Sequence, residues 1–140
     1  MSLVVPNLAD VLMLQYIVNM IAQDGGSAPS GGQRLLHLFI NNQTPGKTTT
    51  LSNFTEATGV PGYAPITLLG SQWTTTTAGG INSAVYSAET FTFTTGVNVY
   101  GYYVTDLSNN LLWAERFSTA PYTMPADGGQ IQISPVLSLN

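Results

Sequence analysis

Charged residues are scarce in this sequence. Three Lys and Arg and seven Asp and Glu make up 7% of its 140 residues, whereas soluble globular domains usually carry about 25%. The fixed cations are Arg34, Lys47 and Arg116, which lie far apart along the chain. Because a protein that binds a phosphate backbone needs a clustered basic surface, this distribution predicts no direct binding to nucleic acid.

Cysteine is absent, and histidine occurs once. The first absence excludes disulfides, thiolate metal sites and cysteine nucleophiles. Histidine-based chemistry would depend on His37, which lies among leucines in an expected strand, so a structural role is predicted for it. The sequence also lacks the Gly-x-Ser-x-Gly motif of a serine hydrolase. We therefore predict no enzyme activity, no catalytic residue, no cofactor and no metal site.

Three patterns resemble chemical sites without meeting their requirements. Residues 41–48 end in Gly-Lys-Thr, but Asn41 stands where a phosphate-binding loop needs glycine. Glu89 and Glu115 are the carboxylates that lie clearly within expected strands, and nothing in the sequence pairs them for glycoside hydrolysis. Residues 106–110 offer oxygen ligands for calcium, yet a hairpin turn capped by Asp106 explains them better.

Neutral residues replace the missing charge. The sequence contains 18 Thr, 11 Ser, 10 Asn and 7 Gln, while hydrophobic residues still reach 44%. This hydrophobic content is too high for a disordered chain, and the length suits a single compact domain. Residues 1–21 contain no Lys or Arg and include Asp10, so neither a signal peptide nor a membrane span is expected.

Residues 1–26 are predicted to form an N-terminal helical arm. Asn7 is a suitable N-cap, Asp10 places a negative charge in the first turn, and Asp-Gly-Gly at 24–26 ends the helix. The arm is apolar over a wide sector, which leaves three interpretations open: packing on its own sheet, docking on another chain, or lying on a membrane surface. A helix that lies on a membrane surface normally has a cationic face, which this arm lacks. For docking, the candidate contact residues are Leu8, Leu12 and Tyr16.

A small-residue linker at 27–33 is predicted to join the arm to a β domain at 34–140. About seven or eight short strands with intervening turns predict a mainly β fold, an antiparallel sandwich or barrel, with a jelly roll as the leading architecture. Pro135 favours an edge position or a bend in the last strand. The expected strands lie at 34–42, 63–69, 73–77, 89–95, 97–106, 111–117 and 130–139.

Aromatic residues crowd one predicted hairpin. Alternation places Tyr100 and Tyr102 on one face of a strand and Tyr103 on the other, with Trp113 on the next strand. One face is expected in the core, and the other is a candidate platform for a protein or a sugar. Tyr100 and Tyr102 are therefore further candidate contact residues.

This hairpin resembles a family of small virion proteins of tailed bacteriophages. The resemblance is strongest for capsid cement, or decoration, proteins of short-tailed phages, and it covers most of the chain. It is carried by VYGYYVTD at 99–106, LLWAERF at 111–117, VPN at 5–7, LHLF at 36–39, NFTEA at 53–57 and GGQI at 128–131.

The resemblance implies a jelly roll that sits as a homodimer or homotrimer on the exterior of a phage head, in contact with the major capsid protein. It supplies no catalytic residues. Binding to the assembled shell would stabilise the shell by mass action. The alternative from another class is a phage tail-fibre, receptor-binding or carbohydrate-binding β-sandwich module whose exposed aromatic residues stack on sugar rings.

Overall fold

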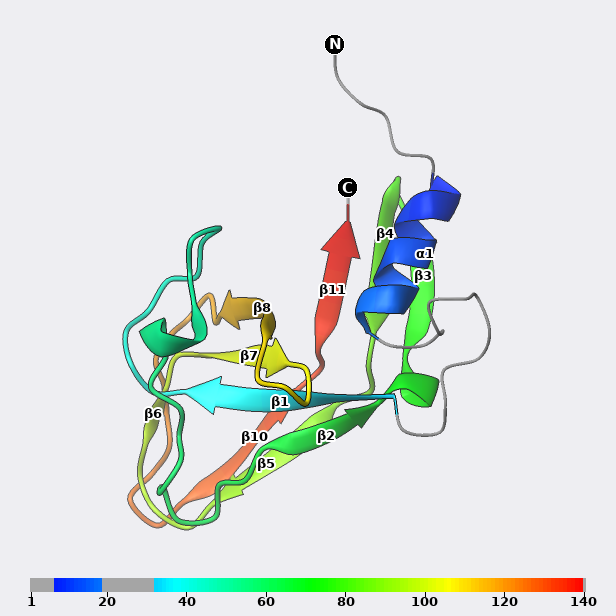
Figure 1. Ribbon diagram of the computed structural model, residues 1–140. Coiled ribbons are helices and arrows are strands. Elements are labelled where there is room, and N and C mark those ends of the chain that lie inside the picture. The colour runs from blue at the N-terminus through cyan, green and yellow to red at the C-terminus, as the bar shows by residue number, and fades with distance from the viewer. Residues whose placement is uncertain (1–6, 19–31, 140) are drawn as a thin grey trace. The chain divides into compact units, whose positions relative to one another are not determined.

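The computed structural model describes residues 7–18 and 32–139 of the chain, and the side chains of 11–18 and 32–139. In these ranges the chain forms one α-helix, two short 3-10 helices and eleven strands in antiparallel sheets (Figure 1). The predicted mainly β class with an N-terminal helix is confirmed, and the sheets are consistent with a β-sandwich. The jelly-roll connectivity stays a prediction.

The strands follow the predicted segments closely, with two additions, whereas the N-terminal helix ends at Ile17 and not at the predicted stop at 24–26. Strands β4 and β9 were not predicted, and the segments 97–106 and 130–139 each divide into two strands. The elements are α1 (Asn7–Ile17), β1 (Gln33–Phe39), η1 (Leu51–Asn53), β2 (Ile66–Leu69), η2 (Gly70–Gln72), β3 (Thr74–Ala78), β4 (Ile81–Val85), β5 (Glu89–Phe93), β6 (Asn98–Val99), β7 (Gly101–Thr105), β8 (Leu111–Arg116), β9 (Tyr122–Thr123), β10 (Gly129–Ile133) and β11 (Val136–Leu139).

The chain divides into two compact units. Unit 1 comprises Met1–Arg34, Leu68–Ala88 and Ser134–Asn140, and unit 2 comprises Leu35–Thr67 and Glu89–Ile133. Two segments within the expected β domain, 68–88 and 134–140, group with the helix. Residues 19–31, which include most of the predicted linker, lie outside the described residues.

Unit 1 contains a three-stranded sheet covered by α1. The strand order is β11-β4-β3, and the helix contacts all three strands (Figure 1). Gly79 and Gly80 join β3 to β4 as a two-residue turn, with φ values of 58° and 81°. Positive φ at both positions is the signature of the hairpin turn that matches strand twist, so the Gly-Gly pair is the sequence signal for the unpredicted β4. Trp73 and Tyr86 are buried in this unit, with ring centroids 5.0 Å apart in an edge-to-face arrangement.

Unit 2 is built around an antiparallel sheet in which β7 lies between β1 and β8. The full strand order is β2-β1-β7-β8, and the first two residues of β1 and the last two of β2 belong to unit 1. Every residue of β7 is buried. Two further pairs, β10-β5 and β6-β9, complete the described strands of the unit. Along β10, Ile131 and Ile133 are buried and alternate with exposed Gln130 and Gln132, as expected of a strand with one face in the core.

The turn between β7 and β8 confirms the predicted hairpin. One carboxylate oxygen of Asp106 accepts hydrogen bonds from the backbone N–H groups of Ser108 and Asn110, at 2.9 and 2.8 Å. Asn109 adopts a positive φ of 62°, which asparagine tolerates better than most residues. The side-chain oxygens of Asp106 thus satisfy the local backbone, as the turn interpretation requires.

Candidate functional site

The described part of α1 has two different apolar sides. Leu14 and Val18, four residues apart, are fully buried and lie on the side that packs within unit 1. Leu12, Met13 and Tyr16 are 40%, 41% and 36% exposed. We refer to these three residues as the α1 apolar face. The helix therefore packs on its own sheet, as the first interpretation predicts, and still presents apolar surface outward.

The end of α1 is held by a cation. Arg34 donates from Nε to the carbonyl oxygen of Ile17 at 2.7 Å and from a terminal nitrogen to that of Tyr16 at 3.4 Å. A guanidinium at this position satisfies carbonyl groups that lack helical partners and complements the negative end of the helix dipole. Two candidate contact residues, Leu12 and Tyr16, thus lie on a helix with a defined end. The side chain of the third, Leu8, lies outside the described residues.

The hairpin tyrosines do not form the expected exposed platform. Tyr102 and Tyr103 point to opposite faces of β7, but both are only 3% exposed because β7 is covered on both faces. The Tyr102 hydroxyl donates to Glu115 on β8 at 2.7 Å. Tyr100 is half-buried, with the guanidinium carbon of Arg116 5.2 Å from its ring centroid. Tyr102 therefore offers almost no surface to a partner, which corrects its assignment as a contact residue.

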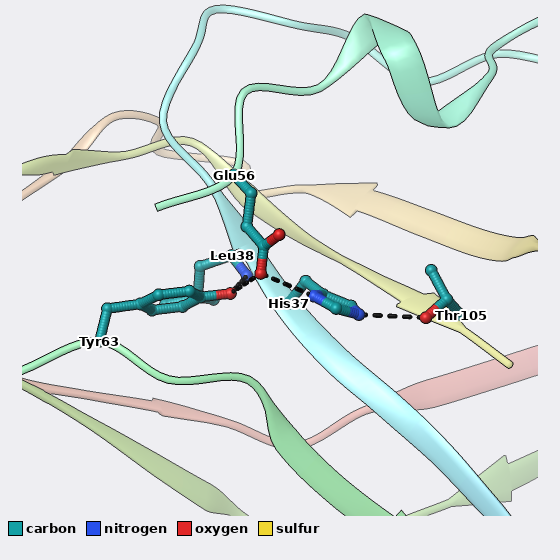
Figure 2. A network of polar contacts seen from close by, with 5 residues as sticks. All are labelled: His37, Leu38, Glu56, Tyr63 and Thr105. Atoms are coloured by element: carbon teal, nitrogen blue, oxygen red, sulfur yellow. Dashed lines mark hydrogen bonds and ion pairs between the residues drawn. The ribbon is translucent and has the colours of Figure 1, made fainter. Parts of the chain in front are cut away.

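A network of polar side chains in unit 2 links β1 and β7 with Glu56 and Tyr63, which lie outside the named strands (Figure 2). His37 of β1 contacts the Glu56 carboxylate through Nδ1 at 2.8 Å and the Thr105 hydroxyl through Nε2 at 3.0 Å. The Tyr63 hydroxyl donates to the same Glu56 oxygen at 2.7 Å and accepts from the Leu38 N–H at 3.2 Å. Since a carboxylate can only accept, Nδ1 carries a proton, and in the neutral ring Nε2 accepts from Thr105.

The network shifts the pKa values of its acidic members in opposite directions. Burial by itself raises the pKa of Glu56, but hydrogen bonds from His37 and Tyr63, and the attraction of His37, outweigh it and hold that pKa below its ordinary value. Burial and the adjacent Glu56 carboxylate raise the pKa of Tyr63 above its ordinary value, and the same two causes act on Tyr103. Both tyrosines therefore stay protonated at neutral pH, while Glu56 stays ionised.

An aromatic ring stacks on the histidine and is itself part of a larger aromatic cluster. His37 and Tyr103 are opposite each other in the β1–β7 register and stack with centroids 4.7 Å apart and planes 6° apart. Phe54 stacks on the other side of Tyr103 at 5.0 Å and contacts Phe39 at 4.8 Å. Such stacking adds to area burial and holds the imidazole in one orientation.

The order Thr105, His37, Glu56 is that of a hydroxyl–imidazole–carboxylate triad. A nucleophile must reach a substrate, however, and Thr105 and His37 are only 1% and 6% exposed. No sequence motif pointed to this cluster, because its members come from four separate segments. The bonds of His37 join β1 to Glu56 and to Thr105 of β7.

A groove in unit 2 was not foreseen from the sequence. Its volume is about 680 Å³, and we call it the β10 groove because four consecutive residues of β10 contribute to it. Tyr122 on β9 is 47% exposed within it. The lining residues are Glu115, Phe117, Ser118, Thr119, Tyr122, Gln130, Ile131, Gln132 and Ile133. The groove forms where β8, β9 and β10 come together, so no local motif indicates it.

Three further features concern metal, phosphate and membrane binding. Residues 7–18 and 32–139 contain no cluster of three or more His, Cys, Asp and Glu residues placed to hold a metal. Residues 41–48 form a loop followed by the short 3-10 helix η1, unlike the strand-to-helix setting of a phosphate-binding loop. Within the described part of the chain, no helix has the length and apolar character needed to cross a membrane. No protein-family model, curated protein or solved structure matches the chain.

Proposed function

We propose that this chain is a structural virion protein, a decoration protein that bridges major capsid protein subunits on the exterior of a phage head. The observation that carries the proposal is the α1 apolar face. Seven of the eight described side chains at 11–18 are apolar or aromatic, and a helix that is apolar nearly all round is normally buried on every side. The capsid surface is the partner that would cover Leu12, Met13 and Tyr16.

The remaining surface supports a role in an assembly. Strand β3 has four exposed residues and is almost entirely threonine, so its surface is polar without charge. Low charge reduces the electrostatic repulsion that keeps small soluble proteins apart. Together with the resemblance to decoration proteins of short-tailed phages, this surface supports homodimers or homotrimers on a lattice of capsid subunits.

The energy available from the α1 apolar face suits reversible addition to a shell. Each of the three side chains has less than half of its surface exposed, so covering each one contributes roughly 1 kcal/mol. One such face is weak, but several copies that bind only the assembled state stabilise that state by mass action.

The test is saturable binding to shells assembled from the major capsid protein of the same phage genome. Wild-type protein is expected to bind these shells and raise their melting temperature. The double variant Leu12→Ser/Tyr16→Ser is expected to lose at least about tenfold in affinity, because two apolar contacts of roughly 1 kcal/mol each disappear. Point substitutions are preferable to deletion of 1–24, since Leu14 and Val18 belong to the core of unit 1.

The matched control is Leu107→Ser. Leu107 is 59% exposed in the β7–β8 turn and lies outside α1, so this variant is expected to bind like wild type. Circular dichroism melting of all proteins checks that the fold is retained. Shells that bind wild type and the double variant equally would contradict the role of α1, and absence of binding by the wild type would contradict the proposed function.

A further inference from the structure

The β10 groove has the size and the mixed lining of a ligand site. Its volume of about 680 Å³ lies within the range of roughly 300–1,000 Å³ found for small-molecule sites. Ile131 and Ile133 are buried, while most of the other lining residues are exposed. The exposed ring of Tyr122 offers a ligand apolar contact area, and the exposed polar residues offer groups that orient it.

The charges of the groove disfavour anionic ligands. Glu115 is the one charged residue among its nine lining residues, and none of them is a Lys, Arg or His. Glu115 is held in place by the hydrogen bond from Tyr102 to Oε2 at 2.7 Å. Because a phosphate, sulfate or carboxylate ligand would meet this negative charge without a compensating cation, the groove is suited to neutral ligands.

The hydrogen-bonding groups suit a ligand with many hydroxyls. Gln130 and Gln132 each donate from Nε2 to a threonine hydroxyl of β5, both at 3.3 Å. An amide has two N–H donors and a carbonyl acceptor, so each glutamine keeps groups for a ligand while its orientation is restrained. Ser118 and Thr119 add hydroxyls, which can donate or accept.

The aromatic residues of the groove provide ring surfaces on which a ligand can stack. Tyr122 is 47% exposed, and Phe117 lies five positions earlier in the same groove. A pyranose ring presents C–H groups on its face, which pack on aromatic rings, and hydroxyls on its edge, which bind amides and carboxylates. We propose that the β10 groove binds neutral oligosaccharides, with Tyr122 as the stacking residue and Glu115, Gln130 and Gln132 as hydroxyl-binding residues.

This inference does not depend on the capsid proposal. The proposed sugar-binding surface is the β10 groove and not the hairpin tyrosines, two of which are buried. The sequence did not single out the groove residues as a sugar-binding surface. A different occupant is an extended peptide added along β10, which pairs with β5 alone among the described strands. The aromatic, amide and carboxylate lining favours the sugar, and the peptide serves as an outcome of the test.

The test measures binding of the isolated full-length protein to maltohexaose, cellohexaose and N-acetylchitohexaose by isothermal titration calorimetry and NMR. At least one hexasaccharide is expected to bind with a Kd of about 1 mM or tighter. Tyr122→Ala is expected to weaken binding at least about tenfold, and Gln132→Ala about three- to tenfold. Tyr122→Phe keeps the ring and is expected to bind within about threefold of wild type.

Leu107→Ala is the control for loss of an exposed apolar side chain outside the groove, and it is expected to leave the Kd unchanged. Three results would overturn the proposal. These are no binding of any hexasaccharide up to about 10 mM, equal binding by Tyr122→Ala and wild type, or binding of an uncharged extended decapeptide in the groove without binding of any sugar. NMR spectra of each variant establish that it is folded.

Discussion

The two compact units satisfy their buried groups in different ways. In unit 2, a buried histidine is bonded on both ring nitrogens and stacked on Tyr103, so a polar network is built into an aromatic core. In unit 1, the helix packs on its sheet through Leu14 and Val18 and leaves three large apolar side chains exposed. Directional bonds specify geometry, whereas apolar packing is non-directional. Unit 1 also contains hydrogen bonds that involve buried polar groups, from Thr77 to Asn82 at 2.6 Å and from Tyr86 to Gln72. The units therefore differ in the network around the histidine of unit 2 and in the exposed apolar face on the helix of unit 1.

The largest expected change in the free energy of unfolding comes from adding a side chain at the central strand of unit 2. A Cβ at Gly101 would lie 2.1 Å from the Glu115 carbonyl oxygen and 2.6 Å from a ring carbon of Phe39. Gly101→Ala is therefore expected to lower the free energy of unfolding by more than about 4 kcal/mol. Gly46→Ala is the matched control, because nothing lies within 4 Å of its Cβ position. Urea denaturation measures both, and a cost below about 1 kcal/mol for Gly101→Ala would show that β7 can shift.

The second effect tests the apolar core of unit 1. Trp73 is 2% exposed and contacts Tyr86 edge-to-face, so Trp73→Ala is expected to cost about 3–4 kcal/mol. Amide hydrogen exchange should increase more at 74–85 than at 101–105, because the cavity forms in unit 1. Ile81→Ala, at a position that is 44% exposed, is the control with a small effect. An equal increase in both units would mean that they unfold as one cooperative body.

The third and smallest effect concerns the network of unit 2. Because the pKa of Glu56 is lowered in the folded chain, the ionised carboxylate contributes stability above its ordinary value of 4.5, and this contribution is lost as the pH falls below that value. Glu56→Gln is expected to cost about 1–3 kcal/mol at neutral pH. The difference from wild type should shrink as the pH falls to about 3.

Asp127→Asn is the control for that experiment, since it removes an exposed carboxylate outside the network. Urea denaturation across the pH range gives the free energy of unfolding of each protein. A constant difference between wild type and Glu56→Gln at every pH would show that the carboxylate's charge does not stabilise the fold.

Local sequence patterns predicted the secondary-structure elements better than they predicted the burial of the side chains on those elements. The alternation of Phe91 and Phe93 with threonines depends on short-range chemistry, and it is confirmed. The alternation of Tyr102 and Tyr103 was also predicted correctly. The prediction that one of the two faces would be exposed was wrong, because both residues are buried. A period of two says which side chains share a face, and it does not say whether each face is covered.

The candidate sites were the least predictable part. Glu56 and Thr105 bond to His37 from two other segments, and Tyr63 bonds to Glu56 from a third. The β10 groove combines residues from 115 to 133. None of these sets has a characteristic spacing. The Gly-Gly turn before β4 did carry a local signal, which a two-residue hairpin rule detects.

By itself, the sequence determined what depends on composition and neighbouring residues: a mainly β chain with little charge, no thiol chemistry, an apolar N-terminal helix and a hairpin capped by Asp106. Tertiary structure alone decided which side of α1 is exposed, that both faces of β7 are covered, and that Tyr122 lies in a groove. The physical reason is that burial is a property of contacts between distant segments. Secondary structure and turns depend on residues a few positions apart, but exposure is determined only once the sheets have packed.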